Sequence, residues 1–190
     1  MKGLLTYYLI LFFSIVLTAQ KDLEKETIYI LPESELVIAG STNVNNFECK
    51  FNIQLICEPK NFSYSLEEEN IIFRNLDLKL LTEGFDCGNK RMNADFQDLL
   101  MNENHPMIII QVKRVELISS EYAKAFIKVT LAGKNKNYEL PVHLNEEHFM
   151  GKFKINIRDF GLEPPTKALG LIEVDEMIEV QFNLKVRELL

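Results

Sequence analysis

The sequence lacks any concentrated block of basic residues. Its 21 Lys and Arg are outnumbered by 28 Asp and Glu, which gives a formal net charge of −7. Proteins that bind the phosphate backbone of nucleic acid depend on clustered positive charge. Nucleic acid is therefore not an expected partner, and the acidic balance is typical of an ordinary solubilising surface.

The residues that build catalytic and metal sites are also scarce. His105, His143 and His148 do not have metal-ligand spacing, and the sequence contains neither Cys-x-x-Cys nor the Gly-x-x-x-x-Gly-Lys pattern of a phosphate-binding loop. His143 lies between Val142 and Leu144, so it should face solvent. No cysteine has a general base nearby in the sequence. We expect no enzyme activity, no cofactor and no metal.

The chain has only three cysteines, Cys49, Cys57 and Cys87. Cys49 and Cys57 fall on one expected strand, where they would lie ~27 Å apart. Because a disulfide needs Cα atoms within ~7 Å, these two cannot pair unless the strand folds back. Cys87 could pair with either one. The favoured interpretation is that Cys49 and Cys57 are small buried hydrophobic residues.

The longest apolar run is at the N-terminus. Met1-Lys2 is positive, Gly3 to Leu17 is apolar, and Thr18-Ala19 precedes the polar residues that start at Gln20. This layout is typical of a secretory signal peptide cut after Ala19; an uncleaved membrane anchor is the alternative, although a spanning helix needs ~20 apolar residues. We predict a signal peptide at 1–19 and one domain at 20–190, periplasmic or secreted, without stable membrane insertion after cleavage.

Alternation of apolar and polar residues dominates the rest of the chain. Phe47, Cys49, Phe51, Ile53, Leu55 and Cys57 alternate with polar residues, which predicts one long strand over residues 46–57. Similar runs predict a first strand within 20–30 and others near 36–39, 62–66, 71–80, 108–112, 123–131, 138–144, 149–157 and 178–186. A change of parity at Arg74-Asn75 indicates a bulge, and Gly133 to Asn137 reads as a hairpin turn.

One segment has helical spacing instead. Met92, Phe96, Leu99 and Leu100 share one helix face, and Asn89 is a suitable N-cap. Because helices do not alternate with strands, we do not expect a parallel α/β sheet, which leaves a barrel or a sandwich. Long strands with one helix favour an all-β fold: an antiparallel, about eight-stranded, lipocalin-like closed barrel with one short amphipathic helix.

Four sequence blocks, in order, resemble the YceI-like family of exported lipocalin-like barrels. They are Gly40-Ser41-Thr42-Asn43-Val44 with Phe47; the helix around Met92 and Phe96 followed by His105-Pro106-Met107-Ile108; Leu131-Ala-Gly133 to Leu140-Pro141-Val142; and Phe153-Lys-Ile155-Asn-Ile157-Arg-Asp159-Phe160-Gly161. The chain departs from the family at Asn89-Lys-Arg-Met-Asn, where many members have D-G-H-L, and at Phe47, where many have Trp. The resemblance implies binding of isoprenoid and other apolar lipids.

The expected site is the barrel interior. Ten apolar residues are predicted to line a tunnel for a polyisoprenoid, quinone or fatty-acid tail: Phe47, Phe51, Ile53, Met92, Phe96, Leu99, Ile108, Ile110, Phe153 and Ile155. Lys90, Arg91 or Lys167 could meet an anionic headgroup. A packed core is the alternative, which would suit an interaction or envelope-stress barrel that pairs with a protein or with itself through outward Tyr122, Phe126 and Tyr138. An enzyme using the apolar pocket ranks last.

Overall fold

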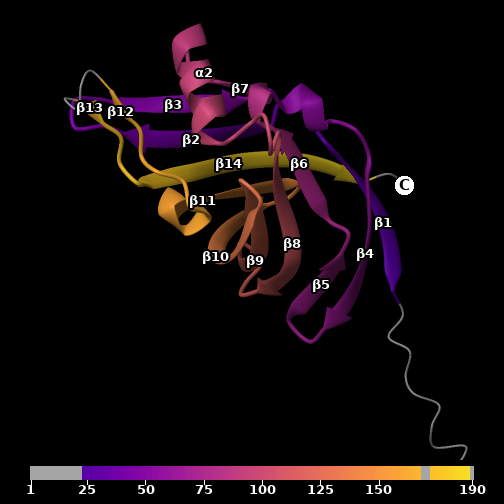
Figure 1. Ribbon diagram of the computed structural model, residues 1–190. Helices are drawn as coiled ribbons and strands as arrows, with labels where there is room; N and C mark the ends of the chain where they lie inside the picture. Colours follow the sequence, from indigo (N-terminus) through magenta and orange to yellow (C-terminus); the bar gives the residue numbers. More distant parts are fainter. Residues whose placement is uncertain (1–22, 168–171, 189–190) are drawn as a thin grey trace, which may run out of the picture.

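The structure is a computed structural model that describes residues 23–167 and 172–188, and it is mostly antiparallel β-sheet (Figure 1). The predicted signal peptide at 1–19 lies outside the described residues. The strands are β1 (Glu24–Ile30), β2 (Glu35–Ser41), β3 (Asn46–Phe51), β4 (Lys60–Glu67), β5 (Asn70–Arg74), β6 (Asp77–Leu81), β7 (Phe85–Asp86), β8 (Met107–Leu117), β9 (Tyr122–Leu131), β10 (Lys134–Asn145), β11 (His148–Asn156), β12 (Thr166–Lys167), β13 (Ile172–Glu173) and β14 (Met177–Glu188). The helices are α2 (Lys90–Leu99) and the 3-10 turns η2 (Ile53–Ile56), η3 (Thr82–Gly84) and η4 (Ile157–Phe160).

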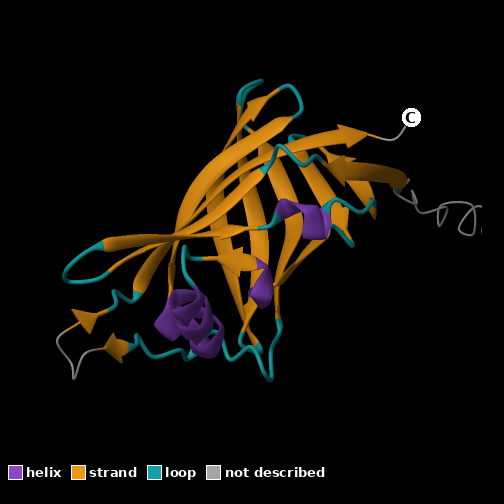
Figure 2. Ribbon diagram, turned by 90° about the horizontal axis from the view of Figure 1, so that it is seen from above, coloured by secondary structure: helices purple, strands orange, loops and turns teal. Residues whose placement is uncertain are grey.

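Eight strands form a closed ring in the order β1, β4, β5, β8, β9, β10, β11 and β14. The ring closes where β14 pairs with β1, from Ile28↔Glu188 to Ile30↔Val186. All these pairings are antiparallel, so the predicted antiparallel fold of about eight strands is confirmed. Figure 2 shows the curved strands from above, with α2 beside one end of them.

Strand β14 also carries an extension of the sheet. Residues Glu179 to Asn183 of β14 pair with β2, and the sheet then continues through β3 to the short β7. Figure 1 shows α2 at the end of the molecule where β3 and β7 lie. The extension therefore places the start of α2 against the end of the ring.

The ring is paired over only a short stretch between the long strands β10 and β11. These strands pair only from His143↔Met150 to Asn145↔His148. On their other edges, β10 pairs with β9 from residue 134 to 143, and β11 pairs with β14 from residue 148 to 156. We call residues 134–142 of β10 and 151–156 of β11 the β10–β11 seam. Side chains, not a backbone ladder, fill the wall at this seam.

Alternation along the strands is confirmed by burial. In β9, Ala123, Ala125, Ile127, Val129 and Leu131 are all buried, while the residues between them are only partly buried. The inward rows of neighbouring strands meet in one core cluster. The pattern in the sequence thus identifies which side of each ring strand faces inward.

The predicted strand over 46–57 ends early. Strand β3 stops at Phe51, because the Asn52 side chain accepts a hydrogen bond from the Gln54 amide (3.2 Å) and starts the turn η2. Leu55, expected to face inward, is 45% exposed. A short polar side chain that can cap a turn therefore overrides the alternation.

The favoured interpretation of Cys49 as an unpaired hydrophobic residue is wrong. Cys49 forms a disulfide with Cys87, across a sequence separation of 38 residues, and this was one of the alternatives that the sequence left open. Cys57 is free and half-buried, and its thiol donates to the Ile53 carbonyl (3.4 Å). The pairing depends on β7, which brings Cys87 beside β3.

Two local predictions are corrected in detail. At Arg74-Asn75 the strand breaks into β5 and β6, with Asn75 at φ 64°, while both pieces pair with β8. The hairpin turn between β9 and β10 is Ala132-Gly133, shorter than the predicted Gly133–Asn137. Both turn residues have positive φ (46° and 73°), as a two-residue hairpin turn of type I′ requires.

Candidate functional site

The ring encloses a small, wholly apolar cavity of about 40 Å³. Its lining comes from the inward rows of the strands and from α2: Leu36, Ile38, Leu80, Phe85, Phe96, Leu100, Ile108, Ile110, Val129, Leu131, Phe153, Ile155, Ile178 and Val180. None of these side chains is polar. Sites for small molecules usually measure about 300–1,000 Å³, so a lipid tail requires these side chains to move apart.

Half of the ten predicted lining residues surround this cavity. They are Phe96, Ile108, Ile110, Phe153 and Ile155. The other five are not part of the lining: Phe51 is buried against Phe85, and Ile53 is buried in η2. Phe47 is half-buried against Gly40 on the extension, and Met92 and Leu99 are half-buried on α2. The structure therefore gathers the ring residues and Phe96 at one place and leaves the β3 and η2 residues and the other two helix residues outside the lining.

Several lining residues were not among the ten. Val129, Leu131, Ile178 and Val180 belong to inward rows that the alternation already marked, whereas Leu36 lies in a strand that was predicted without an inward row. Phe85 had no such signal, because β7 has only 2 residues and thus no period to read. Its ring packs against Phe96, with centroids 5.2 Å apart, and against Phe51, at 4.9 Å.

Helix α2 closes one side of the cavity, and its sequence explains where it begins. The Asn89 side chain accepts a hydrogen bond from the Met92 amide (3.0 Å), which confirms the predicted N-cap. Phe96 and Leu100 lie on one helix face and line the cavity. After the helix, Asn102 is hydrogen-bonded to the fully buried Thr82 side chain, so the far end is also tied to the body of the protein.

The approach to α2 is held by a carboxylate. Asp86 accepts hydrogen bonds from the Gly88 amide (2.9 Å) and from the Asn93 side chain (3.2 Å). These bonds, first the one from Gly88, lower the pKa of Asp86 below its ordinary value. Asn93 also accepts a hydrogen bond from the Cys87 amide (2.7 Å), next to the disulfide. This turn therefore fixes the start of α2 by hydrogen bonds and by a covalent link.

Tyr138 is not the outward residue expected for an interface. It lies on the inward row of β10, and its ring contacts Phe153 (centroids 5.8 Å apart) and Phe160 (6.4 Å). Its hydroxyl is buried and has no hydrogen-bond partner. Burial raises the pKa of Tyr138 to about 12, and the charge of Asp159 adds to the rise. A neutral hydroxyl group therefore lies among aromatic rings at the β10–β11 seam.

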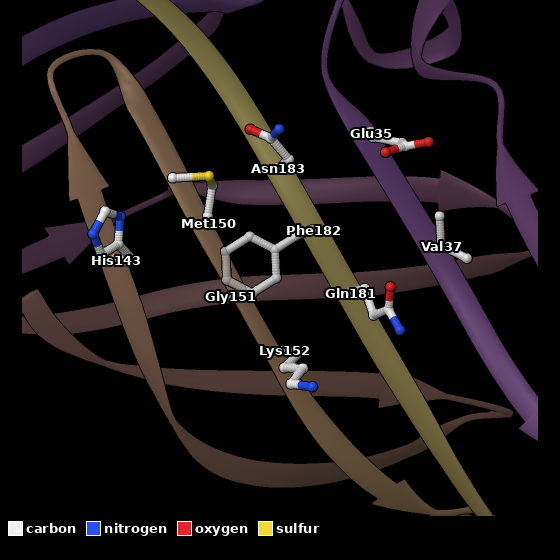
Figure 3. A pocket seen from close by; sticks show the side chains of 9 residues that line it. All are labelled: Glu35, Val37, His143, Met150, Gly151, Lys152, Gln181, Phe182 and Asn183. Carbon is white, nitrogen blue, oxygen red and sulfur yellow. The ribbon is translucent and has the colours of Figure 1, made fainter.

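A second, larger hollow lies on the outer face of the sheet. This groove measures about 500 Å³ and runs across β10, β11, β14 and β2. Figure 3 shows the side chains that line it: Glu35, Val37, His143, Met150, Gly151, Lys152, Gln181, Phe182 and Asn183. His143 is on the outward side of β10, as predicted, but is only half-exposed, with its ring edge-on to Tyr122 (5.0 Å). With charged and amide groups around it, this groove does not suit an apolar tail.

Within residues 23–167 and 172–188, no group of His, Cys, Asp and Glu side chains is arranged to hold a metal ion. Over the same residues, no helix has the length and apolar character needed to cross a membrane. Lys90 and Arg91 are exposed at the start of α2, whereas the side chain of Lys167 lies outside the described residues.

Comparison with known proteins gives a family and a fold. The sequence profile of the YceI-like domain matches residues 34–186. Among curated proteins there is no significant sequence match.

Solved structures with the same fold share little sequence with this chain. BcnA from Burkholderia cenocepacia has a TM-score of 0.60 at 17% identity, covering 82% of this chain and 96% of that one. A polyisoprenoid binding domain from Saccharophagus degradans, implicated in plant cell wall breakdown, has a TM-score of 0.54 at 14% identity, covering 87% and 99%. The YceI protein of Campylobacter jejuni has a TM-score of 0.51 at 19% identity, covering 62% and 74%.

Proposed function

This chain belongs to the YceI-like domain family, and we propose that it is a non-catalytic binding protein for a long-chain apolar lipid held inside the ring. The lipid is of the polyisoprenoid, quinone or fatty-acid type. The observation that carries the proposal is the cavity lining, in which every side chain is apolar. The solved polyisoprenoid binding domain with this fold adds support for a lipid of this class.

Burial of the tail provides the driving force. Each buried CH2 group contributes about 0.8 kcal/mol, and part of this gain is spent on separating the side chains that now leave only about 40 Å³. Because α2 is tied at both ends and the strands are paired, the space for the tail comes from rearranged lining side chains such as Phe96 and Leu100.

Extraction of the purified protein with organic solvent, followed by mass spectrometry, tests the proposal. We expect a long-chain lipid, and we expect the lipid-free protein to take up a fluorescent isoprenoid. Ile178→Phe adds bulk on the cavity side of β14 and should weaken uptake; Glu179→Phe, on the neighbouring position that faces outward, is the matched control. Absence of both extracted lipid and uptake would refute the proposal.

An interaction protein with a packed core is the second candidate. It is favoured by the small size of the cavity and by apolar side chains exposed around the β8–β9 turn: Leu117 (41%), Ile118 (63%) and Tyr122 (51%). Phe126, the other expected interface residue, is covered by the guanidinium of Arg114, 3.6 Å from the ring centroid. Light scattering separates the candidates, because a monomer that binds lipid would exclude a homodimer as the functional form.

The proposal includes export to the periplasm or outside the cell. It is supported by the N-terminal sequence pattern and by the Cys49–Cys87 disulfide, since disulfides persist mainly in oxidising compartments. N-terminal sequencing of the protein from fractionated cells should find Gln20 as the first residue. Recovery of the intact N-terminus in the membrane fraction would instead support an anchor.

A further inference from the structure

The β10–β11 seam contains a buried polar group that has no hydrogen-bond partner among the described residues. The Tyr138 hydroxyl is shielded from solvent and has no hydrogen-bond partner. A buried donor without a partner destabilises the folded protein, because it has lost its hydrogen bonds to water and gained none in return. Such groups are rare. A phenylalanine would fill the same space between Phe153 and Phe160 without this penalty, so packing alone does not explain the hydroxyl. A hydrogen-bond partner from outside the chain would explain it.

The position of Tyr138 connects it to the cavity. Its ring packs on Phe153, which is also a lining residue of the cavity. No backbone ladder joins β10 to β11 here, since their pairing ends at His143↔Met150. Movement of the Phe153 side chain would therefore break no backbone hydrogen bond between these strands.

The chemistry of the seam indicates what the partner must be. Because burial raises the pKa of Tyr138 to about 12, the hydroxyl keeps its proton at physiological pH and can donate it to an oxygen atom. Asp159 lies close enough for its charge to act on Tyr138, and its nearest cation, Lys136, is 3.8 Å away from it. A carboxylate or phosphate on the ligand would be repelled by Asp159, whereas a neutral hydroxyl or carbonyl oxygen would not.

We propose that the Tyr138 hydroxyl donates a hydrogen bond to a neutral oxygen of the bound lipid, so that the protein selects isoprenoids that carry an alcohol or carbonyl over pure hydrocarbons. This inference rests on the proposed function and adds the chemical class of the ligand to it. The oxygen lies at the β10–β11 seam, and the apolar tail extends into the cavity lined by Phe96 and Ile155.

Farnesol and farnesene test this, since they share an isoprenoid chain and differ in the hydroxyl. Kd values for both are measured by competition with a fluorescent isoprenoid, on the wild-type protein, on Tyr138→Phe and on the control Tyr122→Phe, whose side chain is 51% exposed on the outer face. Tyr138→Phe should raise the Kd for farnesol about tenfold, as expected for one lost hydrogen bond, and leave that for farnesene unchanged. Tyr122→Phe should change neither.

The outcomes separate this inference from the function on which it rests. Wild-type protein that binds both lipids, with a farnesol Kd that Tyr138→Phe does not change, would overturn the role of Tyr138 and leave lipid binding in place. An equal rise for both lipids would also overturn it, because it would indicate a loss of packing only. Failure of the wild-type protein to bind either lipid would remove the proposed function as well.

Discussion

The Tyr138 hydroxyl is buried without a partner, so it should reduce the stability of the lipid-free protein. We predict that Tyr138→Phe raises the free energy of unfolding by about 1 kcal/mol, because the ring remains and only the unpaired group is removed. Urea titration measures this as a higher midpoint at constant m-value. The exposed Tyr122→Phe should stay within about 0.5 kcal/mol of wild type. A clear loss of stability in Tyr138→Phe would mean that the hydroxyl has a partner inside the protein.

Single residues also mark the limit of what the sequence predicts. Alternation along β10 places Tyr138 in the inward row with Leu140 and Val142, although the interaction hypothesis predicted it as an outward, interface-forming residue. The pattern was the better guide, because backbone geometry fixes the direction of a side chain whatever its polarity. The lack of a partner for the hydroxyl could not be predicted, since it depends on Phe153 and Phe160, which are remote in sequence.

Among the elements, α2 and its approach depend on the Cys49–Cys87 disulfide. Replacing both with Ala should lower the free energy of unfolding by about 2–4 kcal/mol, because the unfolded chain regains the freedom of a loop of 38 residues. Urea titration of the double variant measures the loss. Cys57→Ala is the control: Cys57 is free, and its replacement should change stability by about 1 kcal/mol or less. Equal effects of the two changes would contradict a stabilising role for the disulfide.

The turn before α2 should respond to acid through Asp86. The hydrogen bonds from Gly88 and Asn93 lower its pKa in the folded state below the ordinary value of 3.8. The folded protein therefore favours the charged form, so this contribution to stability is fully present above the ordinary pKa and is lost as the pH falls through the lowered one. Asp86→Asn should be less stable than wild type at neutral pH, and the difference should disappear in strong acid.

Urea midpoints of both proteins, measured at constant ionic strength over this pH range, check the expectation. A difference that persists unchanged in strong acid would show that Asp86 acts through packing and not through its charge. The main partners of Asp86 are a backbone amide and a side-chain amide, not another charge. Although Asp86 is solvent-exposed, added salt should therefore reduce the difference only modestly.

At the level of elements, the sequence predicted most strands and the helix but not how they are linked. Alternation located the ring strands, and spacing with the Asn89 cap located α2. The end of β3 was missed because Asn52 caps η2, and the disulfide was missed because it depends on the two-residue β7, which has no periodic signal. Five of the ten predicted site residues line the candidate cavity: the ring rows are visible in the sequence, but Phe85 is not.

For the whole molecule, ring closure means that most of the core is shared by all eight strands. β14 pairs with β11 along its length and closes the ring at β1, so no ring strand is free to leave without breaking pairings on both edges. A guest in the interior would contact side chains from several strands at once. Binding should therefore appear as stabilisation of the entire protein and not of one local segment.

We predict that isoprenoid alcohols raise the melting temperature of the lipid-free protein. A ligand present at about 100 times its Kd stabilises the folded state by about 2.7 kcal/mol, which corresponds to roughly 5–10 °C for a chain of this size. In the series geraniol, farnesol and geranylgeraniol, each added isoprene unit should increase the shift until the opened interior is filled, after which further units protrude and contribute little. Ile178→Phe, which adds bulk to the cavity wall, should reach this limit with a shorter chain than Glu179→Phe does. Melting curves that do not move across the series, or that move equally in both variants, would indicate that the tail binds elsewhere, because only an interior site couples the length of the ligand to the volume enclosed by the ring.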